Sequence, residues 1–285
     1  METLTQGYGL VEGPLWVPGQ GLLFSDVLFG GVYCLGLDDQ VSIQFEHRRG
    51  VGGMVLHEQE GVVVSGRNIG FKAFAGGPSL TLLDRDEAAG NVGYNDITSD
   101  PAGRIYAGSL GASPVFEDGR EPQSGDLYLI DVDGNARVVA NDIRLTNGLG
   151  LSPDGKWLYH SDTHRNTVHK YAVSPDGSLG PKDVLAVLPG EAPDGLAVSQ
   201  DGRVWVALAS SSCVVVLDAS GAEVERVSIP VPMCTSVCFG GDDLKDLYIV
   251  SGSNGTGSEK GGGVYRTRAD SPGVPVPLAK VALPT

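Results

Sequence analysis

The hydrophobic and polar positions of this chain follow a short unit that recurs. Four segments begin alike, with an oxygen-bearing residue, a short apolar run and a turn of Pro, Asp and Gly; they start at Glu12, Asn95, Asn147 and Asp194. No amphipathic pattern is long enough to predict a helix. Short apolar runs bounded by Gly and Pro are typical of strands, so the chain is expected to consist of strands and tight turns.

Two further copies of the unit begin near Gly52 and at Thr235, which makes six copies at intervals of roughly 40 to 54 residues. That spacing suits blades of four strands. The strands that we expect, in chain order, are 15–17, 22–25, 31–37, 54–56, 61–65, 70–74, 104–107, 126–131, 157–161, 167–173, 204–207, 213–218, 246–251 and 263–266.

One blade cannot bury both faces of its sheet, so the repeats predict a closed ring of stacked blades. The predicted fold is all-β, a six-bladed β-propeller with four-stranded blades around a central channel, as one domain over residues 1–285. We expect residues 3–11 to complete a sheet with strands from the C-terminal end. A β-sandwich is the alternative, but it does not explain a unit that recurs six times.

The composition of the chain limits the kinds of partner that it can bind. The chain has 41% hydrophobic residues, enough for a sizeable core, with 42 Gly and 17 Pro. Its formal net charge is −15, which argues against nucleic acid or an anionic membrane as a partner, because both attract a basic face. A small-molecule substrate is the partner that we expect.

The start of the chain and its cysteines indicate the compartment. Residues 1–5 show neither the basic nor the apolar region of a secretory signal, and no apolar run approaches the roughly 20 residues of a membrane span. No CxxC pair occurs among the four cysteines, which lie in or beside strand-like segments: Cys34, Cys213, Cys234 and Cys238. We interpret them as buried thiols of a cytoplasmic protein.

The repeats also bring polar residues together. In a propeller the first strand of each blade lines the channel, so the residue before it lies at one mouth. Aligned repeats place in this position two carboxylates, two amides, a hydroxyl and a glycine: Glu12, Asp194, Asn95, Asn147, Thr235 and Gly52. Each alone is typical of a turn or strand entry. Together they predict a shared site, because a turn role does not require six residues to face one axis.

This oxygen-rich set suits a divalent cation. Two carboxylates in a narrow channel repel each other, and a cation removes that cost while accepting amide oxygens as further ligands. Oxygen ligands favour Ca²⁺, Mg²⁺ or Mn²⁺, with Zn²⁺ as a further possibility. His160 and His164 have helical metal-pair spacing but fall on a strand end and its turn, so we do not assign them as ligands.

Loops that follow the second strand of each blade should overhang the site. Two of them are long, 109–124 and 251–262, and are candidates for a lid or substrate wall. His164 and Arg67 lie on other loops of this group and are candidate substrate contacts; surface or loop-anchoring roles are the alternative for these residues and for Arg165. No GxSxG, GxxxxGK[ST] or HExxH motif is present.

Together these motifs resemble the family of senescence marker protein, gluconolactonase and luciferin-regenerating enzyme. The resemblance covers nearly the whole chain, from 12–14 through 147–149 and 193–195 to 235–241. It implies a six-bladed propeller with one catalytic divalent metal, usually a lactonase. By motif match Glu12, Asn147 and Asp194 would bind the metal, and Asn95 would complete its shell or hold substrate.

One position departs from that family. Its sugar lactonases carry an arginine two residues before the asparagine that Asn95 matches, where this chain has Gly93. The segment that follows offers Glu117 as a candidate substrate-binding glutamate. The resemblance therefore implies an intact metal site with an altered region for sugar recognition.

Our hypothesis from the sequence is metal-dependent hydrolysis of a small lactone, either a sugar lactone or a related cyclic ester. The cation would polarise the carbonyl, and Asp194 would act as general base on water. Three alternatives remain: a phosphotriesterase-type hydrolase, a lyase or isomerase on the same metal site, and a non-catalytic calcium-binding propeller.

Overall fold

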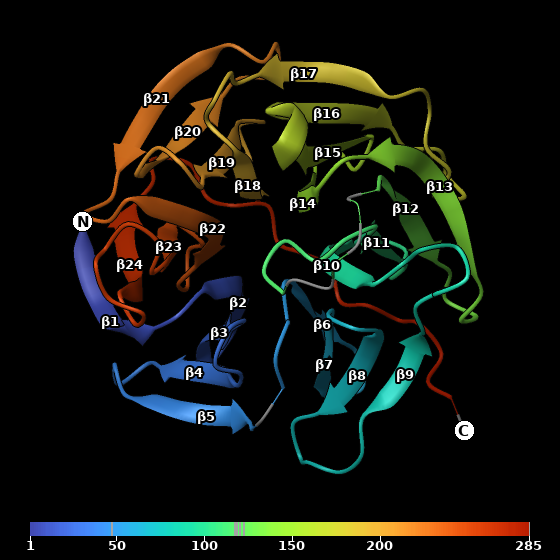
Figure 1. The fold of residues 1–285 in the computed structure, drawn as a ribbon, viewed down its shortest axis with the longest axis horizontal. Helices are drawn as coiled ribbons and strands as arrows, with labels where there is room; N and C mark the ends of the chain where they lie inside the picture. The colour runs from blue at the N-terminus through green and yellow to red at the C-terminus, as the bar shows by residue number, and fades with distance from the viewer. Residues whose placement is uncertain (47, 117–118, 120, 122, 285) are drawn as a thin grey trace.

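The computed structural model describes residues 1–46, 48–116, 119, 121 and 123–284, which form a ring of six four-stranded antiparallel sheets (Figure 1). The six-bladed propeller predicted from the repeats is confirmed. In five sheets the strands follow chain order from the axis outward: β2 Val11–Val17, β3 Gly21–Asp26, β4 Val32–Gly36 and β5 Val41–Phe45; β6 Met54–His57, β7 Gly61–Val64, β8 Ile69–Ala73 and β9 Leu80–Leu83; β10 Gly93–Ser99, β11 Ile105–Leu110, β12 Gly125–Ile130 and β13 Ala136–Ile143; β14 Thr146–Leu151, β15 Trp157–Asp162, β16 Thr167–Ala172 and β17 Asp183–Val187; β18 Pro193–Val198, β19 Val204–Leu208, β20 Cys213–Leu217 and β21 Glu223–Ser228.

The sixth sheet closes the ring. It contains β22 Met233–Gly240, β23 Asp246–Gly252 and β24 Gly262–Arg268, and its outermost strand is β1, Glu2–Tyr8, from the other end of the chain. β1 pairs with β24 in antiparallel register, with Glu2 opposite Arg266 and Tyr8 opposite Gly262. The prediction that residues near the N-terminus complete a C-terminal sheet is confirmed.

The core lies between neighbouring blades. The second and third strands are buried on both faces, as in β7 and β20, where every residue is buried. The outermost strands are largely exposed, as in β21. This difference explains why the apolar pattern predicted the inner strands of each blade and left β5, β9, β13, β17 and β21 without a strand of their own.

A segment beyond β24 crosses the ring at one end of the channel (Figure 1). Its backbone is tied to one side where Val274 N donates to Val198 O (2.8 Å), and to the opposite blades where Ala279 N donates to Leu56 O (2.8 Å) and Lys280 N to Gly103 O (2.8 Å). We call residues 272–282 the C-terminal strap. No pattern in the sequence predicted it.

Between the strap and the middle of the channel lies a cavity of about 540 Å³. Its wall is mainly aliphatic and comes from the later residues of the innermost strands, including Leu15, Leu56, Leu151 and Val198, and from the strap, including Val276. The channel is therefore apolar at the end that the strap crosses.

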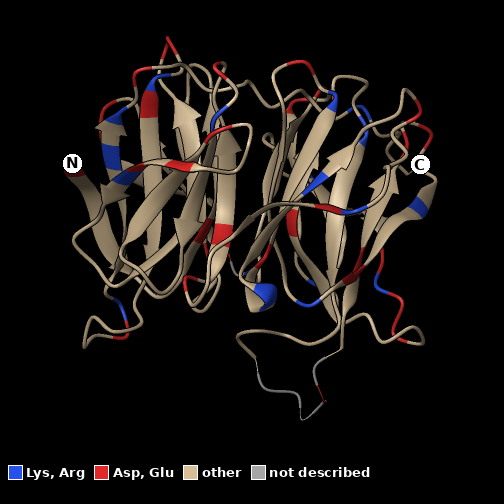
Figure 2. Ribbon diagram, turned by 90° about the horizontal axis from the view of Figure 1, so that it is seen from above, with Lys and Arg blue, Asp and Glu red and all other residues tan. Residues whose placement is uncertain are grey.

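Charged residues occur on strands and on the connecting loops, and Lys and Arg are dispersed among Asp and Glu (Figure 2). Among the described residues no helix is long and apolar enough to cross a membrane. The four cysteines are free thiols; Cys34, Cys213 and Cys234 are buried, whereas Cys238 is half-buried.

Candidate metal centre

The innermost strands are irregular where the candidate ligands lie. The pairing register shifts between Glu12 and Leu15 in β2, and comparable shifts span Asn95 in β10, Asn147 in β14 and Asp194 in β18. A bulge breaks the alternation of side chains and turns one residue out of the sheet's regular pattern. Each of these repeats therefore combines an oxygen-bearing side chain with a bulge, which can turn that side chain away from the regular alternation of the strand.

Close approach of the strands explains why a glycine follows three of these residues. A Cβ atom on Gly148 would lie 2.3 Å from Leu196 N, and one on Gly195 would lie 2.0 Å from Ser236 Oγ. No side chain fits at such distances. The fourth blade can therefore approach the fifth, and the fifth the sixth, this closely only with glycine at these two positions.

The two carboxylates of the predicted ligand set interact strongly. Burial, followed by the neighbouring Asp194 and Asp96, holds the pKa of Glu12 well above its usual range. Burial and Asp96 do the same to the pKa of Asp194. Asp194 is 5% exposed, and its Oδ1 is buried with no hydrogen-bond partner among the described residues.

The two amides are joined directly. Asn95 Nδ2 donates to Asn147 Oδ1 (2.7 Å) and to Thr146 O (2.9 Å), so both N–H groups of Asn95 have acceptors. Asn147 Nδ2 in turn donates to Thr163 Oγ1 (2.8 Å). The Oδ1 atom of Asn95 takes part in neither of the two hydrogen bonds that the amide nitrogen donates, so it remains available to a ligand.

The remaining members of the aligned set have other roles. A Cβ atom on Gly52 would lie 2.1 Å from Asn95 Oδ1, so the glycine provides the space that this amide occupies. Thr235 is fully buried, and its Oγ1 donates to Val11 O (2.6 Å). Its hydroxyl hydrogen therefore bonds the first blade to the sixth.

Sequence reasoning missed Asp96, the residue after Asn95. Burial raises its pKa to about 7, and it is half-buried at the inner end of the cavity. A signal was present: the corresponding residue is Gly13, Gly53, Gly148, Gly195 or Ser236 in the other repeats, so a carboxylate there stands out. A second missed neighbour is Cys234, whose thiol pKa is raised first by burial and also by Asp194 and Glu12.

The candidate substrate residues are not gathered as closely as the candidate ligands. His164 is exposed in η1, a short 3-10 helix of Thr163–Arg165, whose first residue contacts Asn147. Arg67 is exposed on the loop after β7, and its Nη2 lies 3.9 Å from Glu87 Oε1. Glu117 lies outside the described residues.

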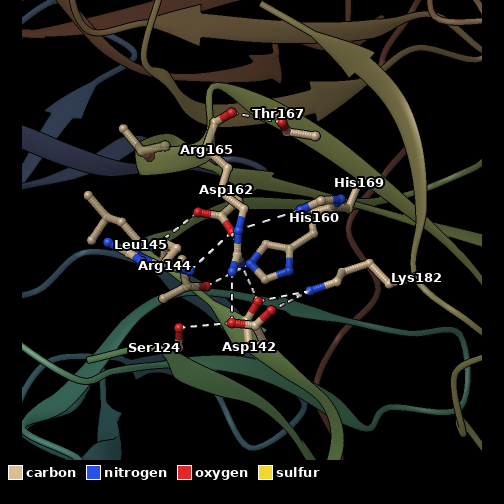
Figure 3. A network of polar contacts seen from close by, with 12 residues as sticks. Ser124, Asp142, Arg144, Leu145, His160, Asp162, Arg165, Thr167, His169 and Lys182 are labelled. Atoms are coloured by element: carbon tan, nitrogen blue, oxygen red, sulfur yellow. Dashed lines mark hydrogen bonds and ion pairs between the residues drawn. The ribbon is translucent and has the colours of Figure 1, made fainter. Parts of the chain in front are cut away.

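A charged network behind Asn147 anchors η1 (Figure 3). Asp162, fully buried, accepts hydrogen bonds from Arg144 N (3.0 Å), Leu145 N (3.1 Å) and Arg165 Nη1 (2.9 Å). Burial opposes ionisation, but these donors and the neighbouring His169 together hold the pKa of Asp162 below its usual range. Arg165 also binds Asp142, so it anchors the loop.

β15, the second strand of the fourth blade, also supports Asn95. His160 is fully buried, and its Nε2 shares a hydrogen bond with Thr146 Oγ1 (2.7 Å). Burial, and then the adjacent His169, lowers the pKa of His160 to about 3, so the ring is neutral at physiological pH. The carbonyl of the same Thr146 accepts from Asn95, which links His160 to the site through one residue.

The residues present fit a hard divalent cation. They offer two carboxylates, of which Asp194 has a buried oxygen without a partner, and amide oxygens from Asn147 and Asn95. Burial is the main cause of both raised carboxyl pKa values, and repulsion between neighbouring carboxylates adds to it; a cation would favour the charged forms against both effects. Among the described residues no group of three His, Cys, Asp or Glu side chains forms a metal cluster. The candidate ligand set is of another kind, because it combines two carboxylates with the amides of Asn95 and Asn147.

Comparisons with known proteins identify the family of the chain. Residues 10–253 match the model of the SMP-30/gluconolactonase/LRE-like region. The chain is 32% identical to a 6-deoxy-6-sulfogluconolactonase of Pseudomonas putida over 94% of each chain, and 31% identical to regucalcin of Gallus gallus over 66% of this chain and 65% of that protein.

A solved structure shows the same fold. It is described as a calcium-binding protein, regucalcin, from Agrobacterium tumefaciens, and superposes with a TM-score of 0.86 at 20% identity over 98% of this chain and 97% of that one. The match of the family model over most of the chain settles the assignment. The protein belongs to the SMP-30/gluconolactonase/LRE-like family.

Proposed function

We propose that the protein is a divalent-metal-dependent lactonase that opens a small sugar lactone or related cyclic ester. The observation that carries the proposal is that Asp194 lies close enough to Glu12 to help raise the pKa of Glu12, while the amides of Asn95 and Asn147, in the same bulged stretch of other innermost strands, are hydrogen-bonded to each other. The family match and the P. putida relative named as a 6-deoxy-6-sulfogluconolactonase support the reaction class.

Glu12, Asn147 and Asp194 would hold the cation, with Ca²⁺ preferred and Mg²⁺, Mn²⁺ or Zn²⁺ as alternatives. When bound, it would supply a Lewis acid that polarises the lactone carbonyl and stabilises negative charge on that oxygen. The regucalcin relatives, one of which is described as a calcium-binding protein, support the binding of a divalent cation.

Asp194 is the proposed general base. A carboxylate has two oxygens, and the buried Oδ1 of Asp194 has no partner within the described protein. One oxygen can therefore serve as a ligand while the other accepts a proton from the attacking water.

Asn95 is proposed to bind a substrate hydroxyl. Both of its N–H groups already have acceptors, so its free Oδ1 can accept a hydrogen bond but the side chain has no donor left for a carbonyl oxygen. This role is narrower than the general contact to a substrate oxygen predicted from the sequence.

Arg67 is proposed to take over the position of the missing family arginine. A Cβ atom on Gly93 would lie 2.7 Å from Gly66 O and 3.4 Å from Arg67 Cα, so the backbone of the second blade occupies the space of a side chain there. The exposed guanidinium of Arg67 can reach substrate from this neighbouring loop and would suit a hydroxylated or anionic substituent.

A screen with and without chelator tests the proposal. The purified protein would be stripped with EDTA, reloaded with Ca²⁺, Mg²⁺, Mn²⁺ or Zn²⁺, and assayed on gluconolactone, its 6-sulfo analogue, an alkyl lactone and a phosphotriester. We expect metal-dependent opening of a sugar lactone that EDTA abolishes. Arg67→Gln should raise KM for the preferred lactone with little change in kcat, whereas Arg85→Gln serves as a nearby control.

The outcomes separate the alternatives. Cation binding without turnover of any lactone would favour a calcium-binding propeller, for which the regucalcin relatives are the supporting observation. Turnover of the phosphotriester alone would favour a phosphotriesterase. Lactone turnover that persists at full rate after complete removal of metal would overturn the proposed mechanism.

A further inference from the structure

A chain of hydrogen bonds runs around the candidate centre in one direction. Asn95 Nδ2 donates to Asn147 Oδ1 (2.7 Å), Asn147 Nδ2 donates to Thr163 Oγ1 (2.8 Å), and Thr163 Oγ1 donates to Pro193 O (2.7 Å). The chain thus passes from the third blade through the fourth to the fifth. It ends on the peptide unit that immediately precedes Asp194.

The last acceptor fixes the direction of the chain. The carbonyl of Pro193 can only accept, and a threonine hydroxyl has one hydrogen, which it gives to that carbonyl. Thr163 Oγ1 can therefore only accept from Asn147, so the amide nitrogen of Asn147 must face the threonine. Its oxygen is then turned toward Asn95.

The other end of the chain is fixed in the same way. The Thr146 carbonyl also only accepts, so the group of Asn95 that contacts it must be the amide nitrogen. Both asparagines therefore direct N–H groups into the protein. Asn95 Oδ1 is left for a cation or a substrate, and Asn147 Oδ1, which already accepts from Asn95, keeps its second lone pair for a cation.

Thr163 itself is rigidly held. Its backbone N donates to Leu145 O (3.0 Å), and the preceding residue is the buried Asp162, which accepts from two backbone amides and Arg165 (Figure 3). Asn166, in a left-handed conformation with φ of 52°, closes the turn with its N–H on Thr163 O. The hydroxyl therefore occupies a preset place beside Asn147.

We propose that Thr163 is a positioning residue that, together with Asn95, sets the direction of the Asn147 amide, so that oxygen rather than N–H faces the cation. The inference rests on the proposed cation site. If the amide turned over, Asn147 Oδ1 would face a hydroxyl oxygen whose hydrogen is already used, and the N–H group would face the cation. Both contacts are repulsive.

Three variants test this role. Thr163→Val keeps the shape but removes the hydroxyl, and Thr163→Ser restores it. Thr167→Val is the matched control, because Thr167 Oγ1 also donates to a backbone carbonyl of the same loop, Arg165 O (2.9 Å), but contacts neither asparagine. Ca²⁺ affinity of the stripped proteins would be measured by titration calorimetry, and folding by circular dichroism and thermal melting.

We expect Thr163→Val to weaken Ca²⁺ binding by about 10-fold or more, as is usual when the partner of a metal ligand is removed. Thr163→Ser should bind nearly as well as wild type, and Thr167→Val should change melting without changing affinity. Equal affinities of wild type and a folded Thr163→Val would overturn the role of Thr163 alone. A wild-type protein that binds no divalent cation would overturn the cation site as well.

A double-mutant cycle with Asn147→Asp distinguishes direction from mere support. A carboxylate has oxygens on both sides, so it needs no residue to orient it. The loss of affinity caused by Thr163→Val should therefore shrink in the Asn147→Asp background. An equal loss in both backgrounds would show that Thr163 only supports the loop, and would contradict the proposal.

Discussion

The two ends of the central channel are formed by the same innermost strands, yet their chemistry is opposite. At the starts of the strands, bulges accompany Glu12, Asn147 and Asp194, and the space between blades is polar. At their later residues the pairing is regular, and Leu15 and Leu151 face an apolar cavity crossed by the C-terminal strap.

This contrast shows how one repeated strand can serve two purposes. The bulged start places buried polar groups that repel one another, which costs stability. The regular remainder packs between blades and compensates for that cost. Substitutions at the polar end should therefore alter chemistry, whereas substitutions at the apolar end should alter stability.

The largest expected effect is at the polar end. Asp194→Asn keeps the shape of the side chain but removes the proposed base, so kcat at saturating cation should fall by about 10²- to 10⁴-fold. The melting temperature without cation should stay equal or rise, because a repulsive charge is removed. Normal turnover by the fully loaded variant would show that Asp194 is not the base.

A smaller effect is expected at the apolar end. Leu151 is 8% exposed, packs in the core between the third and fourth blades and lines the cavity. Leu151→Ala should lower the free energy of unfolding by about 2–5 kcal/mol. Urea denaturation measures this loss, and kcat of the folded variant should match wild type. A fall in kcat comparable to that of Asp194→Asn would break the division between the two ends.

The smallest expected effect is a pH dependence of the free energy of unfolding, which arises from His160 near the polar end of the channel. The pKa of His160 falls from an unfolded value near 6.5 to about 3 on folding, so the folded state binds fewer protons. This contribution to stability is complete above pH 6.5 and is lost as the pH falls toward 3. At pH 5 the loss is about 2 kcal/mol.

His160→Gln should abolish that loss. Between pH 8 and pH 5 its free energy of unfolding should improve relative to wild type by about 2 kcal/mol. Comparison with wild type cancels the contributions of the carboxylates, which titrate in both proteins. His164→Gln is the control, since His164 is exposed, and should follow the wild-type curve. Parallel curves for all three proteins would contradict the assignment to His160.

Much of the fold was predictable because turns of Pro, Asp and Gly bound the strands of each repeat. Apolar runs such as those of β7 and β20, bounded by turns, predicted the buried strands, and the need to close a ring predicted the pairing of β1. The C-terminal strap was not predictable. It is held mainly by backbone hydrogen bonds to several blades, such as those of Ala279 N to Leu56 O and Lys280 N to Gly103 O, and bonds of this kind require no particular side chains.

The candidate site was predictable only where the repeat varied. Alignment identified Glu12, Asn95, Asn147 and Asp194, and their roles as ligands or substrate contacts stay predictions. Asp96 also departs from the repeat, which has Gly or Ser at that position in the other copies, but the prediction considered only the preceding position. Thr163 could not have been found from the pattern, because its importance depends on a hydrogen bond to Pro193, 30 residues away.

Closure of the sixth sheet has a consequence for how the protein is made. β1 leaves the ribosome first, but its partner β24 emerges only after the other blades. Until then the edge of β1 lacks a partner, and β2, which carries Glu12, has no neighbouring sixth blade to fix its place. The candidate site is therefore completed only after β24 has been synthesised, because a nascent chain that still lacks β24 also lacks the finished sixth blade beside Glu12.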